Sequence, residues 1–426
     1  MGVVVTRAAR KRRLEEEERL RDHISGLPDA VLGEIVSLLP TKEGARTQAL
    51  SSRWRHIWAS ASLPLLDLRG ESITSDEVSR ILSSHRGPVR RFFVRVVPRE
   101  GGAATLDGWL RSPALNNLHE LDFHLSFPHP PPLPEPARRF APTLRAASFG
   151  GCSFSDGDAT AGALHLPLLK QLSLVNARIS AGSLHALIAG CPVLESLLLV
   201  ENLGCPRTQI VSPSLRSIAV CSGSGGQLRL QRLIIEDAPC LERLLFFRDK
   251  EDMDISVISA PRLAILGKLT SNFLRLQFGT TTSLSEGTGN GSSLGSNIQL
   301  HGGKKNAWRL KYRNLIGTLD IHLKEIVLAG YLGNKSHVNF AKFFMSKARV
   351  LESVTLELLL EEDGNRTISS AWVETQRRLL QINKRARHVQ FDFVPRNMSI
   401  SRSLSDRCER KQLHDLSAAD PFESFR

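Results

Sequence analysis

The first pattern along the chain is a set of apolar residues at helical spacing between Asp22 and Ser60. Pro28 suits the first helical position, because the backbone N–H that proline lacks has no helical partner there. The next proline, Pro40, ends this helix. The apolar positions between the two prolines are Val31, Leu32, Ile35, Leu38 and Leu39. Their recurrence predicts an amphipathic helix.

Two further short helices are predicted before Ser60. Thr41 is a candidate N-cap for the second, although Gly44 removes the carboxylate of a capping box and weakens that helix. The apolar residues of the third are Ala49, Leu50, Trp54, Ile57 and Trp58. A unit of about forty residues cannot bury two tryptophans and this many aliphatic side chains by itself. The surplus predicts a surface that faces a neighbouring domain or a partner protein.

A repeat of 21 to 26 residues follows, marked by prolines at positions 142, 167, 192, 213, 239 and 261. Apolar residues recur at the second, fifth and seventh positions after each proline, as in Leu169, Leu172 and Leu174. This LxxLxL pattern is typical of leucine-rich repeats, and it lapses in the last unit at Lys268. Each unit is predicted to form a short strand, and stacked parallel strands bury a continuous core. Helices or irregular segments are expected outside, such as a serine-capped helix from Ser180 to Gly190.

The register of the repeats also predicts the concave face of the solenoid. Residues at the fourth, sixth and eighth positions after each proline point away from the buried ladder. They are mostly small or apolar, and such a face suits a protein or peptide target better than a nucleic-acid backbone. The candidate target-binding residues are Gln171, Ser173, Ser196, Leu198, Ser217, Arg243, Leu245 and Phe247.

Composition and pattern divide the chain into six predicted segments. They are a charged arm (1–21), the helical region (22–60), the repeats (61–278), a Gly/Ser/Thr-rich stretch (279–303), a second region of strands and helices (304–395) and a tail (396–426). The Gly/Ser/Thr-rich stretch is predicted to be a disordered loop, because it holds nothing that joins a core. In the second region we expect a helix from His337 to Ala348, a strand from Leu351 to Leu359 and an amphipathic stretch from Trp372 to Asn383.

The helical region resembles an F-box of the plant type. The matching elements, in the family's order and spacing, are Leu27-Pro28-Asp29, Ile35, Leu38-Leu39-Pro40-Thr41-Lys42, Arg46-Thr47, Leu50-Ser51, Arg53-Trp54-Arg55 and Trp58. In that family the F-box docks on a Skp-type adaptor, which bridges it to a cullin and a RING subunit in an SCF ubiquitin ligase. The resemblance implies adaptor contacts, or their support, at Leu27, Pro28, Ile35, Leu39, Leu50, Trp54 and Trp58. Periodicity alone equally allows these helices to cap the neighbouring domain.

The end of the chain is similar to the FBD region that closes many plant F-box/leucine-rich-repeat proteins. The similar segments are Leu323–Leu328, Phe340–Phe344, Ala348–Glu352 and Asp420–Phe422. We therefore expect an α/β chain in which a small helical F-box precedes a leucine-rich-repeat solenoid with short parallel strands inside and helices or irregular segments outside. The FBD region is predicted to add repeats and a cap over the last strand edge.

Charge adds a second hypothesis about partners. The net charge of +13 suits a nucleic-acid or acidic partner only where it is concentrated, as in Arg7–Arg13, Lys304–Arg313 and Arg377–Arg387. Such runs are more often solvated faces, so nucleic-acid binding is not the expected function. Arg7–Arg13 also fits a nuclear-import signal, and Gly2 opens a loose myristoylation pattern. No apolar run spans a bilayer, so we expect the nucleus and/or the cytoplasm.

Catalytic and metal-binding patterns are not found in the sequence. The six cysteines form no CxxC pair and have no histidine at zinc-ligand spacing, so they are expected to be reduced and mostly buried thiols. No cofactor is implied. The expected function is a non-catalytic receptor subunit that holds a target protein for a ligase. The alternatives are a leucine-rich-repeat scaffold with a vestigial F-box, motivated by Gly44, and a nuclear protein associated with nucleic acid.

Overall fold

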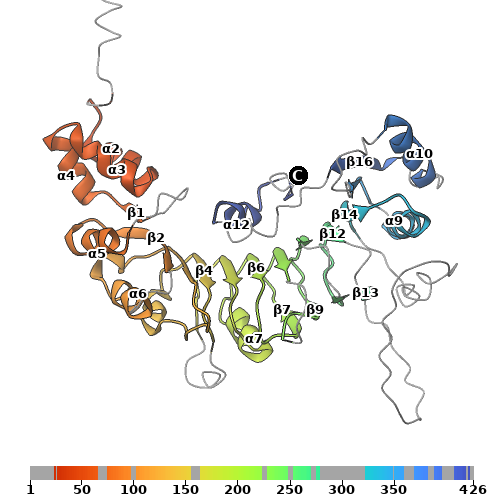
Figure 1. Ribbon diagram of the computed structural model, residues 1–426, viewed down its shortest axis with the longest axis horizontal. Helices are drawn as coiled ribbons and strands as arrows, with labels where there is room; N and C mark the ends of the chain where they lie inside the picture. The colour runs from red at the N-terminus through yellow and green to blue at the C-terminus, as the bar shows by residue number, and fades with distance from the viewer. Residues whose placement is uncertain are drawn as a thin grey trace, which may run out of the picture. The chain divides into compact units, whose positions relative to one another are not determined.

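The computed structural model describes fourteen stretches of the chain (Figure 1): residues 24, 26–65, 74–96, 102–154, 164–222, 228–247, 253–269, 275–278, 322–348, 350–358, 369–381, 388–395, 407–418 and 421–422. They fall into two compact units. Unit 1 runs to Val94 and includes Asp107–Glu120, and unit 2 holds Arg95–Leu106 and everything from Leu121 onward. The predictions for the arm 1–21, including Gly2, and for the loop 279–303 lie outside the described residues, and the predicted domain bounds stay a prediction.

Unit 1 begins with the predicted short helices. They are α2 (Asp29–Leu38), α3 (Thr41–Arg46), the 3₁₀ helix η1 (Thr47–Ala49) and α4 (Ser52–Ser60). Pro28 and Pro40 occupy the N-cap positions of α2 and α3, so each helix begins one residue after its proline. Thr41 is therefore the first residue of α3 and not its cap.

Buried side chains of α2 and α4 form the centre of this helical region. Leu32 and Val36 of α2 and Trp54 and Trp58 of α4 are all buried. Gly44 of α3 lies against the ring of Trp58, where a Cβ atom would come within 2.6 Å of Cζ3. The glycine that weakens α3 in isolation therefore makes room for a tryptophan in the folded unit.

The remaining elements of this part of the chain are β1 (Leu63–Leu65), α5 (Ser75–Ser84), β2 (Val89–Val96), α6 (Gly102–Leu110) and the 3₁₀ helix η2 (Pro113–Leu115). The side chain of Thr74 and that of Glu77 close a capping box at the start of α5. Trp109 packs edge-on against Phe92 and donates a hydrogen bond from Nε1 to Ser79 Oγ at 2.9 Å. These contacts join α5, β2 and the end of α6 within unit 1.

The main sheet of unit 2 runs in the order β3-β4-β5-β6-β8-β10-β12-β14-β15-β16, and the strands from β4 onward pair in parallel with their neighbours. The strands are β3 (Glu120–Leu125), β4 (Ala146–Gly150), β5 (Gln171–Val175), β6 (Ser196–Val200), β8 (Ser217–Cys221), β10 (Arg243–Phe246), β12 (Ile265–Leu269), β14 (Glu325–Tyr331), β15 (Ser353–Leu358) and β16 (Gln390–Pro395). This is the sheet of short parallel strands that the repeat predicts, and it confirms the α/β fold class.

The predicted register of the repeats is confirmed. Leu172 and Leu174 at the fifth and seventh positions are fully buried, and equivalent residues stand side by side across the strands. Charges at the third position form pairs along the turns, as between Lys170 Nζ and Glu195 Oε1 at 2.8 Å. Asn202, just after β6, accepts a hydrogen bond from the backbone N–H of Ala177 and donates one to the carbonyl of Leu174.

The lapse of the repeat at Lys268 is a β-bulge. Leu266 pairs with Ile326 and Leu269 pairs with Leu328, so Gly267 and Lys268 together oppose a single residue of β14. Lys268 has a positive φ of 54°, and Leu269 takes the buried position that the pattern assigns to residue 268. The extra residue keeps the apolar ladder intact through Leu269 and brings the Lys268 Nζ to 6.0 Å from the ring centroid of Phe247.

On the outside of the repeats, the helix predicted from Ser180 to Gly190 is confirmed as α7 (Ala181–Ala189), with Ser180 as its N-cap. Later repeats carry instead a second parallel sheet that the sequence analysis missed, in the order β13-β11-β9-β7. Its strands are β7 (Arg207–Val211), β9 (Arg232–Asp237), β11 (Asp254–Val257) and β13 (Arg275–Phe278). The alternation of polar and apolar residues in β11, Asp254-Ile255-Ser256-Val257, was an available signal.

From Glu325 onward, the FBD-like region continues the same sheet through β14, β15 and β16, as predicted. Its helices are α9 (Lys335–Lys347) and α10 (Ser370–Leu380), close to the expected stretches. Tyr331 of β14 donates a hydrogen bond to Gln376 of α10 at 2.9 Å and packs near Trp372. The region therefore adds repeats to unit 2.

Candidate functional site

The first candidate surface is an apolar patch on the helices of unit 1. Leu38 at the end of α2 is 77% exposed and Leu50 after η1 is 66% exposed. The exposed large apolar residues of this region are Ile24, Val31, Ile35, Leu38 and Leu50. We call these five residues the F-box patch. Clusters of exposed apolar side chains on a folded unit mark sites where another protein binds.

The predicted adaptor-binding residues divide into two groups by exposure. Pro28, Ile35 and Leu50 are exposed, and Leu27 and Leu39 are partly buried, so all five can touch a partner. Trp54 and Trp58 are buried and hold α4 against α2 and α3, so they support the patch from below. Sequence reasoning left Ile24, Val31 and Leu38 out of its candidates. Helical spacing identifies the apolar residues of a helix. It does not say which of them are buried within the unit and which stay exposed.

The second candidate surface is the concave face of unit 2, and the end of the chain covers it. We call residues 407–418 and 421–422 the C-terminal segment; it begins with α12 (Arg407–Leu413). Figure 1 shows α12 beside the main sheet of unit 2, far along the chain from the strands that it contacts. The sequence analysis predicted a tail here, with only Asp420–Phe422 assigned to the segments similar to the FBD.

His414 fixes the middle of the C-terminal segment to strands β5 and β6. Its Nε2 lies 2.7 Å from Ser173 Oγ, and its Nδ1 lies 2.7 Å from Ser196 Oγ. The side-chain amide of Gln171 donates a longer hydrogen bond of 3.4 Å to the carbonyl of His414. Burial, with a smaller effect of the nearby Arg410 guanidinium, lowers the pKa of His414 to about 4. The imidazole is therefore neutral near pH 7.

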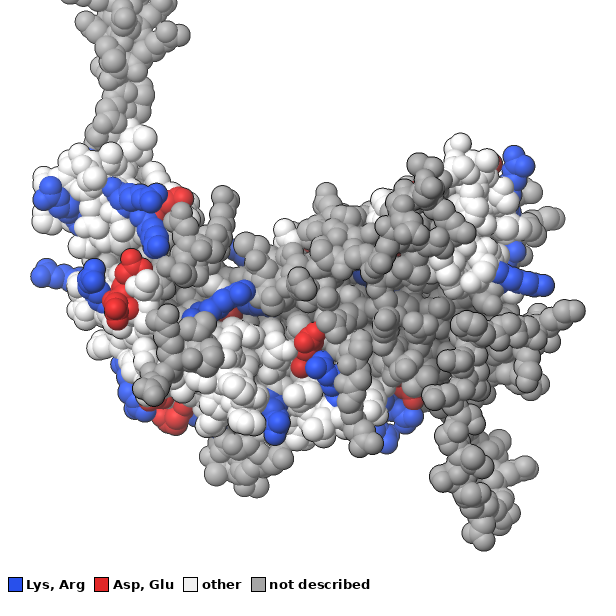
Figure 2. All heavy atoms as spheres, in the orientation of Figure 1, with Lys and Arg blue, Asp and Glu red and all other residues white. Residues whose placement is uncertain are grey.

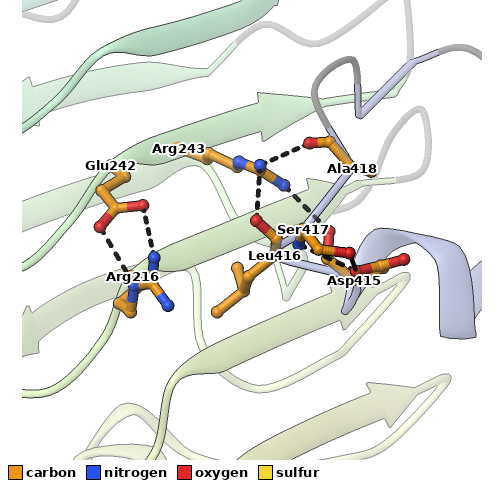
Figure 3. A network of polar contacts seen from close by, with 7 residues as sticks. All are labelled: Arg216, Glu242, Arg243, Asp415, Leu416, Ser417 and Ala418. Carbon is orange, nitrogen blue, oxygen red and sulfur yellow. Dashed lines mark hydrogen bonds and ion pairs between the residues drawn. The ribbon is translucent and has the colours of Figure 1, made fainter.

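Arg243 of β10 binds the backbone that follows His414 (Figure 3). Its Nη1 donates to the carbonyl of Asp415 at 3.0 Å, and its Nη2 donates to those of Leu416 and Ala418 at 3.0 and 2.6 Å. Burial lowers the pKa of Arg243 from its ordinary value, although the group stays charged. One guanidinium thus fixes the course of four consecutive residues.

Arg410 of α12 forms a buried ion pair with Asp122 of β3, with 2.7 Å between Nη2 and Oδ2. The neighbouring His124 has a lowered pKa, chiefly because of burial, with Arg95 and Arg410 adding to the effect. A buried ion pair forms only where both partners are held in good geometry. This ion pair therefore fixes the position of α12 against strand β3.

Phe422 closes the far end of the C-terminal segment. Its ring is fully buried against Gly267, where a Cβ atom would come within 1.9 Å of Cζ, and it packs near Phe247 with 5.7 Å between ring centroids. Lys268 Nζ lies 5.7 Å from the centroid of Phe422 and pairs with Glu357 Oε1 at 2.9 Å. The bulge in β12 thus provides both the space and the cation for this ring.

Leu413 and Phe422 join one apolar cluster with side chains of the sheet. The cluster consists of Val175, Leu198, Val200, Ala219, Cys221, Leu245, Phe247, Val327, Leu413 and Phe422. All eight predicted target-binding residues lie on this face, as the register requires. The C-terminal segment covers this face: seven of the eight residues are buried and Gln171 is partly buried. Their role in target binding stays a prediction.

No described residues suggest a reaction centre. The Ser173–His414–Ser196 contact resembles part of a catalytic arrangement, but all three side chains are buried, so no substrate reaches them. Burial raises the pKa of Cys152 and of Cys191 to about 12, which suits packing and not reactivity. Within the described stretches no group of His, Cys, Asp and Glu side chains is arranged to hold a metal ion. No helix there is long and apolar enough to cross a membrane.

Comparison with known families identifies the class of the chain. An F-box domain model matches residues 24–66, the LRR repeats described for FBD-associated F-box protein At5g56370 match residues 106–294, and an FBD model matches residues 313–356. The chain is an F-box protein with leucine-rich repeats and an FBD, and its homologues are FBD-associated F-box/LRR proteins of Arabidopsis. This confirms the resemblance inferred from the sequence. The matched F-box contains every residue of the F-box patch.

Individual relatives give the same picture. F-box/LRR-repeat protein At3g03360 of Arabidopsis thaliana is 29% identical over 240 residues, which are 51% of this chain and 48% of the relative. FBD-associated F-box protein At5g27750 of the same plant is 28% identical over 260 residues, 54% of this chain and 55% of the relative. The chain spans about half the length of the curated relatives it matches.

Proposed function

We propose that the chain is the substrate-recognition subunit of an SCF-type ubiquitin ligase. In this proposal the F-box binds a Skp-type adaptor, which links it to a cullin and a RING subunit, and unit 2 holds a target protein. The observation that carries the proposal is the F-box patch, because it exposes five large apolar side chains while Leu32, Val36, Trp54 and Trp58 of the same helices are buried.

The proposed chemistry belongs to the other subunits of the ligase. F-box/LRR proteins are generally non-catalytic adaptors, and this chain would contribute the position of the target relative to the ubiquitin-carrying enzyme. Proximity and orientation can supply a large share of the acceleration of a transfer reaction. The proposal needs two binding surfaces and no catalytic side chain.

Co-purification of the full chain with a Skp-type adaptor tests the proposal. The double variant Leu38→Ala, Leu50→Ala removes two exposed side chains and leaves the helices folded. Truncating one hot-spot side chain of an interface costs about 2 kcal/mol or more, so with one hot spot among the two leucines we expect affinity to fall at least roughly thirtyfold. Leu168→Ala, at an exposed leucine of unit 2, is the matched control and should bind like wild type.

The two alternatives predict different results in the same experiment. A scaffold with a vestigial F-box would bind no adaptor while remaining folded. The packing of Gly44 against Trp58 weakens the motive for this alternative, because the glycine has a role in the fold. A nucleic-acid-binding protein would bind DNA or RNA with a steep salt dependence. On the face shown in Figure 2 the described Lys and Arg side chains are scattered, and several of them lie beside Asp or Glu.

We further propose that the protein works in the nucleus and/or the cytoplasm, where ubiquitin ligases of this type operate. The basic cluster Arg7–Arg13 supports the nuclear part of this proposal. Imaging of a fluorescent fusion with and without substitution of these arginines tests it. Loss of nuclear signal in the substituted chain is the expected result.

A further inference from the structure

We propose that the concave face of unit 2 is a peptide-binding site that the chain's own C-terminal segment fills, and that an external protein using this face presents a similar peptide and competes with the segment. The peptide pattern follows from Arg410, Leu413, His414 and Phe422: an arginine, a Leu-His pair three residues later, and a phenylalanine eight residues after the histidine. The inference rests on the proposed function in one respect, namely that the competing peptide belongs to the target.

The contacts of the segment have the character of an interface that can separate. Permanent interfaces are predominantly apolar, whereas exchangeable ones combine apolar anchors with many polar contacts. Here Arg243 binds three backbone carbonyls, His414 lies between two serine hydroxyls, and Arg410 pairs with Asp122. Leu413 and Phe422 are the apolar anchors.

These contacts divide into general and specific ones. The guanidinium of Arg243 binds carbonyl oxygens, which every peptide offers, so it would hold any chain that follows the same course (Figure 3). Asp122 selects a cation, and the space above Gly267 accepts the ring of a phenylalanine. The face therefore contains separate subsites for an arginine and a phenylalanine.

One hydroxyl on this face is not used by the segment. Ser217 Oγ is fully buried, and none of the described residues offers it a hydrogen-bond partner. It stands between Ser196 and Arg243 in the register of the sheet, in the middle of the contact row. A buried hydroxyl without a partner is unfavourable. If the segment were a permanent part of the core, we would expect it to form a hydrogen bond with the Ser217 hydroxyl. An exchangeable segment can leave this hydroxyl without a partner, and a different peptide could then bond to it.

The covalent connection explains why a competitor would not bind readily. A tethered ligand acts at an effective concentration of about 1 mM for a short linker. When the connection is cut in a solution of about 1 µM protein, the concentration of the competing segment falls about a thousandfold. An external peptide should then bind far more tightly to the cut protein than to the intact one.

The test uses the full chain with a recognition site for a specific protease placed within residues 396–406. After folding, the preparation is divided and one half is cut. The probe is a fluorescent synthetic peptide of residues 404–426, and its anisotropy reports binding. We expect the probe to bind the cut protein at least about 100-fold more tightly than the uncut protein, and the released segment to appear in solution.

Matched probes test the specific subsites. The Arg410→Ala peptide should bind at least about 100-fold more weakly, because it loses the pair with Asp122. The Lys411→Ala peptide removes an exposed basic residue next to it and should bind like the parent peptide. The inference is overturned if the cut segment stays on the protein and the probe does not exchange, or if the probe fails to distinguish cut from uncut chain.

Adaptor binding by the same preparations separates this inference from the proposed function. Probe exchange with no adaptor binding would refute the ligase proposal and leave a self-occupied peptide site. Adaptor binding with no probe exchange would leave the ligase proposal in place and show that the C-terminal segment is a fixed part of unit 2.

Discussion

The F-box patch and the concave face are both built from apolar side chains, but they differ in what covers them. Leu38 and Leu50 of the patch are mostly exposed, whereas Leu198 and Leu245 of the concave face are buried beneath the C-terminal segment. Exposed apolar surface is ready for a partner, and covered surface must be vacated first. Under the proposed function, the comparison describes a chain whose adaptor-binding surface is open and whose target-binding surface is covered.

The largest expected effect removes an anchor of the covered face. Arg410→Ala deletes one member of the buried pair with Asp122 and should destabilise docking of the C-terminal segment by about 3–5 kcal/mol. Hydrogen exchange at the backbone N–H groups of His414 and Asp415, which are bonded within the segment, measures this opening.

The neighbouring residue is the control for that change. Lys411 is exposed, so Lys411→Ala should change the free energy of opening of the segment, obtained from the exchange rates, by less than about 0.5 kcal/mol. Equal effects of the two substitutions would mean that the Arg410–Asp122 pair does not hold the segment in place.

The second effect concerns the open surface and its support. Gly44→Ala brings a Cβ atom to 2.6 Å from the ring of Trp58 and should destabilise unit 1 by about 1–3 kcal/mol. Gly33→Ala in α2 meets nothing within 4 Å and should stabilise the helix by up to about 1 kcal/mol. Urea unfolding followed by tryptophan fluorescence measures both changes. If Gly44→Ala left the free energy of unfolding unchanged, Trp58 would not be fixed against Gly44 as described.

The third effect is a pH dependence of the covered face. The pKa of His414 falls from an ordinary 6.5 to about 4 on burial, so the unfolded segment binds a proton between these values and the docked one does not. Stability from this group is complete above pH 6.5 and is lost as the pH falls toward 4. Between pH 7 and 5 the loss should be about 2 kcal/mol.

His414→Gln isolates that contribution, because it cannot titrate. The pKa values of His85, His124 and His337 are also lowered by burial, so some pH dependence remains in the variant. The difference between wild type and His414→Gln in urea unfolding at pH 7 and pH 5 is the quantity to measure. No difference would contradict a neutral, buried imidazole.

The smallest expected effect lies on the open surface. Asp29 and Arg53 form an ion pair of 2.7 Å between α2 and α4, but both side chains are more than a third exposed. Solvent screens such pairs, so Asp29→Ala should cost less than about 1 kcal/mol in urea unfolding. A larger loss would show that this pair, and not the packing of the tryptophans, holds the F-box helices together.

Much of the fold could be predicted because it follows local periodicity. The LxxLxL spacing placed Leu172 and Leu174 in the core, and the F-box prolines marked the starts of α2 and α3. Local pattern could not predict the bulge at Lys268, because a lysine is favourable there only through Glu357, which lies 89 positions later in the chain. Long-range pairing of this kind leaves no local signal.

The same reason explains why the covered face was missed. The register identified Ser173, Ser196 and Arg243 as neighbours, but their partners His414 and Asp415 come from the end of the chain. Two signals pointed there: Gly267 at a strand position that usually carries a side chain, and Phe422 within a segment similar to the FBD. Neither residue indicates a contact by itself, because the role of Gly267 is to leave space for the ring of Phe422.

The most direct test of the account is hydroxyl-radical footprinting of the full chain, which measures the solvent access of individual side chains. We predict rapid oxidation of Leu38 and Leu50, with protection once a Skp-type adaptor is added, and slow oxidation of Leu413 and Phe422 in both states. Oxidation of Leu413 and Phe422 at the rate of an unfolded chain would contradict the claim that the protein covers its own concave face.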